Sequence, residues 1–212
     1  GIAFDLAFKY RNPAIILADG VIGQMMEKVV LPEQRTRLTD EEVIARCPWA
    51  TTGRTHHRTP NIITSLELDP AEMEKRNIHL QKKYAEIEEN EVRFEELHCE
   101  DAEYLIVAFG SCARIAQKAM EMAREEGIKV GLLRPITLWP FPSKAIAARA
   151  AQVKGILTVE LNAGQMVEDV RLAVKCKVPV EHFGRLGGIV PDPDELFSVR
   201  AVNNFIILPS IC

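Results

Sequence analysis

The residues of this sequence that could do chemistry are few, and the first group follows a short apolar run. Gly110, Ser111 and Cys112 come directly after the run Tyr104–Phe109. If a helix begins there, its free amides could receive a phosphate and its dipole could lower the pKa of the Cys112 thiol. The surrounding sequence has neither a glycine-rich phosphate motif nor a neighbouring histidine to activate the thiol. We therefore expect Ser111 to be a simple helix cap and Cys112 a buried small residue.

A second candidate is the pair His56 and His57, which lies between Arg54 and Arg58. Such a group could bind a metal ion or an anion. However, adjacent side chains rarely face the same way, and no third ligand stands at a suitable spacing, so we expect no metal site. Glu160, at the end of another apolar run, could be a general base, but nothing in the sequence singles it out.

Three further residues suit contacts with another chain. Arg134 could hold an anion or pair with a carboxylate of a partner. Trp139 and Phe141 stand among three prolines and form a rigid apolar projection, which suits either local packing or an interface. We predict Arg134, Trp139 and Phe141 as interface residues, and we predict no catalytic, cofactor-binding or metal-binding residue.

The elements that must position these residues are strands alternating with helices. Apolar runs predict buried strands at 104–109, 130–133, 155–160 and 177–182. Helical patterns follow at 111–126, at 143–151 behind a Ser143 cap, after Asn162 with Gln165 completing a capping box, and from Asp192 to about Asn203. This alternation predicts a three-layer α/β/α, Rossmann-like domain with a mostly parallel sheet. Ligands of such sheets sit at the carboxyl ends of the strands, here Gly110-Ser111, Arg134-Pro135, Glu160–Asn162 and His182–Gly188.

The first ninety residues show a different pattern. A helix is predicted over Gly1–Tyr10, with Ile2, Leu6 and Phe8 buried, and a single buried strand over Pro13–Ala18. One helix and one strand cannot bury their own faces. This favours the end of a truncated doubly wound domain over an extra layer on the main domain.

An irregular connection follows. One helix start lies within this connection, and a second follows it. Thr39 and Glu42 have the spacing of a capping box, which predicts a short helix from Asp40 to Cys47. Asp69 and Pro70 begin a long charged helix that runs to about Asn90. One apolar stripe marks the face that this helix buries, formed by Met73, Leu80, Tyr84 and Ile87.

Composition limits the class of protein. The chain has 212 residues, a net charge of −4 and 47% hydrophobic residues, which is ordinary for a soluble globular protein and does not suggest binding to nucleic acid or membrane. No run is long enough to span a membrane, and no secretory signal is visible. Five scattered cysteines without a CxxC spacing predict neither a disulfide framework nor an iron–sulfur site, and favour the cytoplasm.

Three stretches resemble a known family: Ala18–Glu27, Gly110–Ile115 and Gly131–Pro142. The run Leu-Arg-Pro-Ile-Thr-Leu-Trp-Pro-Phe-Pro at 133–142 is the most specific of them. Together they look like the alpha subunit of 2-oxoacid:ferredoxin oxidoreductases, of the 2-ketoisovalerate or branched-chain type. The resemblance covers nearly the whole chain and matches the carboxy-terminal part of that subunit.

The resemblance implies three parts. Residues 1–35 match the terminal helix and strand of a domain that binds the pyrimidine end of thiamine diphosphate, and residues 36–91 form a linker with a long helix. Residues 92–212 are similar to the carboxy-terminal domain of transketolase, which implies a five-stranded sheet with Val92–Leu97 as an antiparallel edge strand. The segment that carries most cofactor and substrate contacts in the family is missing from this chain.

The family's reaction implies the cofactors and partners. A 2-oxoacid is oxidatively decarboxylated, its acyl group passes to coenzyme A and its electrons to ferredoxin. Thiamine diphosphate, coenzyme A and iron–sulfur clusters are implied for the whole complex and none for this chain alone. The implied partners are the beta, gamma and ferredoxin-like delta subunits and ferredoxin. None of the family's catalytic residues falls on a numbered position, so we expect a structural part of the enzyme that is inactive alone.

Two alternatives stay open from the sequence. The chain could be a subunit of another thiamine-dependent 2-oxoacid dehydrogenase. It could also be a stand-alone domain of transketolase type that binds a small anion at its strand ends.

Overall fold

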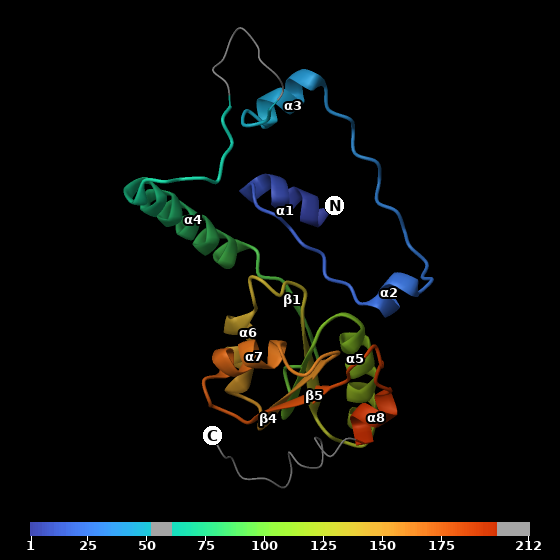
Figure 1. Ribbon diagram of the computed structural model, residues 1–212. Coiled ribbons are helices and arrows are strands. Elements are labelled where there is room, and N and C mark those ends of the chain that lie inside the picture. Colours follow the sequence, from blue (N-terminus) through green and yellow to red (C-terminus); the bar gives the residue numbers. More distant parts are fainter. Residues whose placement is uncertain (52–60, 199–212) are drawn as a thin grey trace. The chain divides into compact units, whose positions relative to one another are not determined.

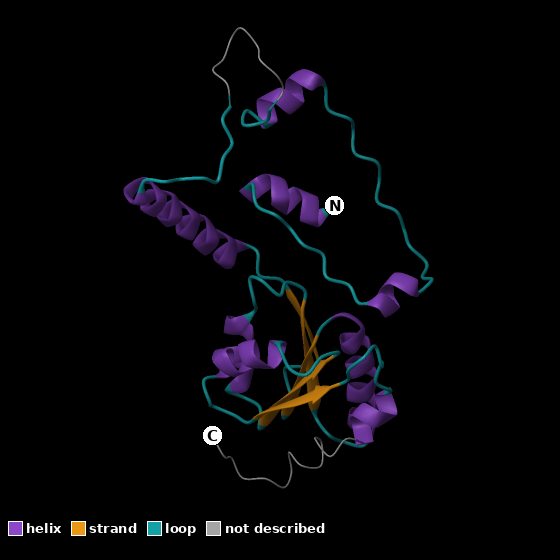
Figure 2. Cartoon of the chain, viewed as in Figure 1, coloured by secondary structure: helices purple, strands orange, loops and turns teal. Residues whose placement is uncertain are grey.

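The computed structural model describes residues 1–51 and 61–198 (Figure 1, Figure 2). The predictions for residues 54–58, and for the last helix beyond Ser198, lie outside the described residues. The chain divides into two compact units: one holds residues 1–25 and those from 81 onward, and the other holds residues 26–80. Among the described helices, none combines the length and the apolar character needed to cross a membrane.

The centre of the first unit is a five-stranded sheet in the order β1-β3-β2-β4-β5. Its strands are β1 (Phe94–Leu97), β2 (Tyr104–Ala108), β3 (Val130–Pro135), β4 (Gly155–Glu160) and β5 (Val180–Gly184). The last four strands are parallel, whereas β1 pairs antiparallel with β3 at one edge. This confirms the predicted fold class and the antiparallel edge strand, which begins at Phe94 rather than at Val92.

Helices cover both faces of the sheet. α5 (Gly110–Glu125) and α8 (Pro193–Ser198) pack on one face, while α6 (Ser143–Ala150) and α7 (Met166–Val174) pack on the other (Figure 1). Neighbouring residues of one strand point to opposite layers: Leu105 lies in the cluster under α6 and α7, and Ile106 in the cluster under α5. Because side chains alternate along a strand, an unbroken apolar run is what a strand buried on both faces requires.

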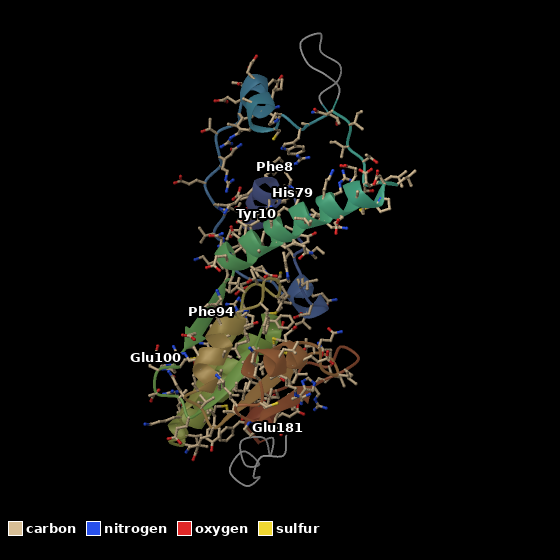
Figure 3. All side chains as sticks on the ribbon, turned by 90° about the vertical axis from the view of Figure 1, so that its left-hand side faces the viewer. Phe8, Tyr10, His79, Phe94, Glu100 and Glu181 are labelled. Atoms are coloured by element: carbon tan, nitrogen blue, oxygen red, sulfur yellow. The ribbon has the colours of Figure 1, made fainter. Side chains whose placement is uncertain are left out.

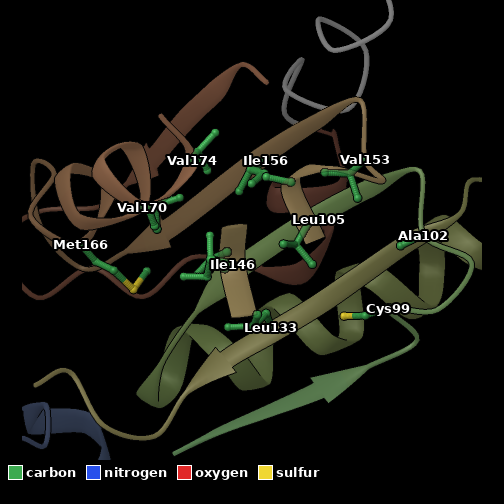
Figure 4. Packing of buried hydrophobic residues seen from close by; sticks show 13 residues of the cluster. Cys99, Ala102, Leu105, Leu133, Ile146, Val153, Ile156, Met166, Val170 and Val174 are labelled. Atoms are coloured by element: carbon green, nitrogen blue, oxygen red, sulfur yellow. The ribbon is translucent and has the colours of Figure 1, made fainter. Parts of the chain in front are cut away.

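In the core cluster under α6 and α7, the apolar spacing of the α7 sequence corresponds to the buried face of that helix. Met166, Val170 and Val174 recur at helical spacing and belong to the same core cluster as Ile156 of β4 (Figure 4). Their burial was predicted and is confirmed. Two predicted caps are wrong: Ser111 and Ser143 are helical residues, and neither the Phe109 nor the Pro142 that precedes them makes a side-chain cap bond.

The amino-terminal segment forms the predicted helix but buries a different side of it. α1 (Ile2–Tyr10) leaves Ile2 and Phe8 exposed and buries Tyr10 (Figure 3). The segment Pro13–Ala18 is extended, yet it is not a strand, because no backbone hydrogen bond joins residues 14–18 to another described residue. Ile15, Ile16 and Leu17 are exposed along it, and the short helix α2 (Gly20–Gln24) follows.

The second unit contains α3 (Asp40–Arg46), and its predicted capping box is present. The Glu42 amide donates to the Thr39 hydroxyl, and the Thr39 amide donates to the Glu42 carboxylate at 2.8 Å. α4 (Pro70–Asn90) begins at the predicted Asp69 cap, whose carboxylate accepts from the Ala71 amide. The predicted division of the chain into residues 1–35, 36–91 and 92–212 stays a prediction.

Glu91, directly after α4, ties α1 to the rest of the first unit. Its carboxylate accepts from Lys9 Nζ at 2.7 Å, from the Tyr10 hydroxyl at 2.8 Å and from Arg93 at 3.2 Å. These bonds, that of Lys9 first and that of Tyr10 second, lower the pKa of Glu91 to about 2 against the opposing effect of burial. Three donors from two segments therefore converge on one buried carboxylate.

This convergence predicts a stability difference that depends on pH. The folded pKa of Glu91 lies below its ordinary value of 4.5, so its contribution is present above about pH 4.5 and is lost as pH falls towards 2. We expect Glu91→Gln to lower the free energy of unfolding by about 1 kcal/mol at pH 7, since the partner Lys9 is half exposed. Urea unfolding at pH 7 and at pH 3 would check this. A difference that persists undiminished at pH 3 would contradict the ionic origin.

Candidate functional site at the carboxyl ends of the strands

The candidate site is the point where the chain reverses its direction across the sheet. From β2 the chain crosses one face through α5, and from β4 it crosses the other face through α7, while β2 and β4 are neighbours. The amino termini of α5 and α7 therefore begin at the same edge, between two parallel strands. In open α/β sheets this switch point is where ligands bind.

The amino terminus of α5 is occupied by a carboxylate from far away in the sequence. The Asp19 carboxylate accepts a hydrogen bond from the Ile22 amide of α2 at 2.8 Å, and its Oδ2 lies 3.8 Å from the position of a Cβ built on Gly110, the first residue of α5. Partial burial alone would raise the pKa of Asp19, but the bonds from Ile22, Ser111 and Val21 outweigh it and lower that pKa. The place where a phosphate could have been received is thus occupied by a side chain of the chain itself, and sequence reasoning missed Asp19 in this role.

Cys112 lies behind this carboxylate in the first turn of α5. It is buried, and burial raises the pKa of its thiol to about 11, with the negative charges of Asp19 and Glu160 adding to the effect. The reading of Cys112 as an activated nucleophile is therefore wrong, because a nucleophilic thiol needs a lowered pKa. The expected role as a small buried residue is confirmed.

Glu160, the last residue of β4, caps α7. Its carboxylate accepts from the amides of Gln165 at 3.2 Å, Met166 at 2.8 Å and Val167 at 3.0 Å, and the residue is 1% exposed. The predicted capping by Asn162 and Gln165 is wrong. Asn162 instead accepts from the Gly164 amide within the loop, which turns the first amides of α7 back towards the strand end.

His182 of β5 completes the cluster. Its Nδ1 lies 3.4 Å from the Glu160 carboxylate and 3.3 Å from the Thr158 hydroxyl, and that hydroxyl donates to the Glu181 carbonyl at 3.0 Å. Because both neighbours of Nδ1 are acceptors, we assign the proton to Nδ1. Nε2 is buried and makes no hydrogen bond within the described part of the chain.

Two glycines allow the His182 ring to lie so close to the backbone. A Cβ added at Gly184 would come within 2.1 Å of the Asn162 carbonyl oxygen and 2.6 Å of His182 Nε2. A Cβ added at Gly164 would come within 3.1 Å of Val167 and 3.7 Å of the His182 ring. The cluster is therefore packed tightly, and no group of three or more potential metal ligands is found among the described residues.

The predicted interface residues lie apart from this cluster. Arg134, at the end of β3, pairs with Glu95 of β1 at 3.0 Å, and both side chains are about half exposed. Trp139 packs edge-on against Tyr84 with 5.7 Å between the ring centroids and leaves half of its surface exposed. Phe141 packs partly buried against the core cluster under α6. Their role in an interface stays a prediction.

Comparison with known proteins places these features in a family context. Residues 102–196 match the family described as "Pyruvate:ferredoxin oxidoreductase core domain II". The chain is 48% identical to ketoisovalerate oxidoreductase subunit VorB of Methanothermobacter marburgensis, over 94% of this chain and 55% of that protein. It is 32% identical to 2-oxoglutarate synthase subunit KorA of Archaeoglobus fulgidus, over 90% of this chain and 53% of that protein. The chain thus spans about half the length of the curated relatives it matches.

A solved structure shows the same architecture. The chain is similar to the 2-oxoglutarate:ferredoxin oxidoreductase from Magnetococcus marinus, with 2-oxoglutarate, coenzyme A and succinyl-CoA bound. The TM-score is 0.57 and the identity 25%, and the match covers 66% of this chain and 24% of that one.

Proposed function

Because the chain belongs to the family of 2-oxoacid:ferredoxin oxidoreductase subunits, we propose that it is part of the alpha subunit of a 2-ketoisovalerate:ferredoxin oxidoreductase. The enzyme would oxidatively decarboxylate a branched-chain 2-oxoacid, transfer the acyl group to coenzyme A and reduce ferredoxin. In the proposed complex, beta, gamma and delta subunits carry the remaining parts of the active site.

The observation that carries this proposal is the 48% identity to a ketoisovalerate oxidoreductase subunit across almost the whole chain. The identity to the 2-oxoglutarate synthase subunit of Archaeoglobus fulgidus is lower, at 32% over a similar share. This difference favours a branched-chain substrate over 2-oxoglutarate.

Within this enzyme we assign the sheet domain a supporting role. At the switch point the first amides of α7 already bind the Glu160 carboxylate, and the Asp19 carboxylate lies beside the first residue of α5. A second anion there would meet these two negative charges, so the described residues of the cluster do not fit a diphosphate at this edge. Cofactor chemistry is accordingly assigned to the rest of the complex.

We also propose that residues 1–35 are the end of the pyrimidine-binding domain. α1 is apolar on several sides, with Ile2, Phe4 and Phe8 exposed, which is typical of a helix that is covered in the complete protein. The extended segment Pro13–Ala18 has the composition of a buried strand and leaves its backbone groups unpaired among the described residues. A sheet contributed by the rest of the subunit would satisfy both.

The exposed surface around Trp139 is proposed as a contact with another subunit. Its indole is held by Tyr84 and by flanking prolines, so little side-chain freedom would be lost on binding. Arg134 and Phe141 stand at the two ends of the same run. A half-exposed, pre-ordered tryptophan has the character of an interface hot spot.

The proposed function predicts a substrate order for the assembled enzyme. We expect the complete alpha subunit with its partners to reduce ferredoxin or a viologen dye in the presence of coenzyme A, with a kcat/KM for 2-ketoisovalerate at least about tenfold above that for 2-oxoglutarate or pyruvate. We expect residues 1–212 alone to give no activity and no heat on titration with thiamine diphosphate or coenzyme A. Preference for 2-oxoglutarate would refute the substrate, and tight binding of either cofactor to the isolated chain would favour a stand-alone domain.

A further inference from the structure

Asp19 makes contacts that an ordinary helix cap does not make. Its carboxylate accepts from the Ile22 amide of α2 at 2.8 Å and also reaches the first turn of α5, where Ser111 contributes to lowering the pKa of Asp19. An N-cap carboxylate normally satisfies the amides of its own helix only. Asp192 is such an ordinary cap, since its carboxylate accepts from the Asp194 amide of α8.

A distance places the Asp19 carboxylate against α5. Its Oδ2 atom lies 3.8 Å from the position of a Cβ built on Gly110, the first residue of α5. The same proximity adds to the raised pKa of the Cys112 thiol, after the larger effect of the burial of that thiol.

The segment that Asp19 ends is attached to the sheet domain at two places. Near Tyr10 the attachment is the Glu91 carboxylate, supported by Lys83, which donates to Asn12 at 3.1 Å. At the other end the attachment is Asp19. Between them, residues 14–18 make no backbone hydrogen bond to the described residues. We therefore expect the position of α2 on the sheet domain to depend on Asp19.

We propose that Asp19 is a positioning residue that joins the segment before residue 26 to the strand-end edge of the sheet domain by capping α2 and α5 with one carboxylate. Its effect on turnover rests on the proposed function, because the joined segment would then be the end of the pyrimidine-binding domain. The joint itself rests on the contacts alone. Asp19 touches no reacting atom, so it acts by fixing the arrangement of two domains.

The joint is tested by Asp19→Asn in the complete subunit within its assembled complex, with Asp192→Asn as the matched control. Thiol labelling with N-ethylmaleimide, quantified by mass spectrometry, reports on Cys112, which is 3% exposed behind the joint. Cys99, which is 1% exposed and lies in the cluster on the opposite face of the sheet, is an internal control. Hydrogen exchange of residues 20–24 and 110–113 is followed in the same samples.

We expect Asp19→Asn to speed Cys112 labelling by about fivefold or more, the factor that corresponds to losing about 1 kcal/mol of capping. Labelling of Cys99 should stay unchanged, and exchange should rise in residues 20–24 and 110–113 together. The control Asp192→Asn should alter neither Cys112 labelling nor exchange in those two stretches. If exchange rises only in residues 20–24 while Cys112 labelling is unchanged, Asp19 caps α2 alone and the joint is refuted.

Turnover gives the second readout. In an active complex, Asp19→Asn should lower kcat about fivefold with the KM for the 2-oxoacid unchanged, because a smaller fraction of the enzyme holds its domains productively while substrate contacts stay intact. Unchanged kcat beside faster Cys112 labelling would refute the catalytic consequence. If the wild-type complex oxidises no 2-oxoacid, the proposed function fails, while labelling and exchange still decide whether the joint exists.

Discussion

Glu160→Gln is expected to lower the free energy of unfolding by about 2–4 kcal/mol, because it replaces a buried, fully bonded carboxylate by an amide that matches only part of the donors. Oε2 accepts from two amides of α7, and Oε1 accepts from a third and lies 3.4 Å from His182 Nδ1. Every group around the side chain is a donor. A glutamine must turn its NH2 group towards one of these donors. The NH2 group and the donor that it faces are then both left without an acceptor.

The measurement is urea unfolding followed by circular dichroism, with Glu168→Gln as the matched control. Glu168 lies in the first turn of the same helix and is exposed, so its replacement should change the free energy of unfolding by less than about 0.5 kcal/mol. A loss in Glu160→Gln no larger than that of the control would contradict the assignment of Glu160 as the acceptor that holds α7.

The same contacts explain what the sequence could and could not predict. Strands and helices from residue 104 onward follow from local patterns, since an apolar run of five or six residues and a 3.6-residue stripe report burial directly. The strand β4 was predicted with its bounds, Gly155–Glu160, and α4 with Pro70–Asn90. The antiparallel edge strand β1 came from the family resemblance, because its sequence of charged residues alternates only partly.

The caps could not be predicted, because they depend on which acceptor the tertiary fold places against the first amides of the helix. Ser111 and Asn162 have the right residue type and position for local caps. In the structure Glu160, from the preceding strand, caps α7, and the carboxylate of Asp19, from a distant segment, lies beside the first residue of α5. A charged acceptor binds amides more strongly than a hydroxyl or an amide oxygen does. The local sequence signal for these two carboxylates is an acidic residue at the end of an apolar run. Asp19 stands before Gly20, and Glu160 stands before Leu161.

The extended segment Pro13–Ala18 shows the opposite limit. Its composition predicts a buried strand, yet a strand exists only where another strand supplies the ladder of hydrogen bonds. Among the described residues none pairs with it, so Ile15, Ile16 and Leu17 are exposed. The residue pattern of a segment indicates the environment in which it is stable. For Pro13–Ala18 we propose that this environment is a sheet of the complete subunit.

Gly184→Ala is expected to be at least as destabilising as Glu160→Gln. We expect it to lower the free energy of unfolding by about 3 kcal/mol or more, because the added methyl group meets the backbone rather than a movable side chain. Its Cβ would lie 2.1 Å from the Asn162 carbonyl oxygen and 2.6 Å from His182 Nε2. The carbonyl oxygen cannot retreat without shifting the loop that turns the first amides of α7 towards Glu160. A side chain at Gly184 is therefore expected to weaken the hydrogen bonds by which Glu160 caps α7.

Two further variants separate the sources of this strain. Gly23→Ala is the control, since a Cβ at Gly23 meets nothing within 4 Å, and its free energy of unfolding should stay within about 0.5 kcal/mol of the wild type. The double variant Gly184→Ala with His182→Ala removes the clash with the ring and keeps the clash with the Asn162 carbonyl. We expect it to be no more stable than Gly184→Ala alone. Recovery to the level of His182→Ala would show that the imidazole, rather than the loop that turns α7 towards Glu160, is what requires a glycine at this position.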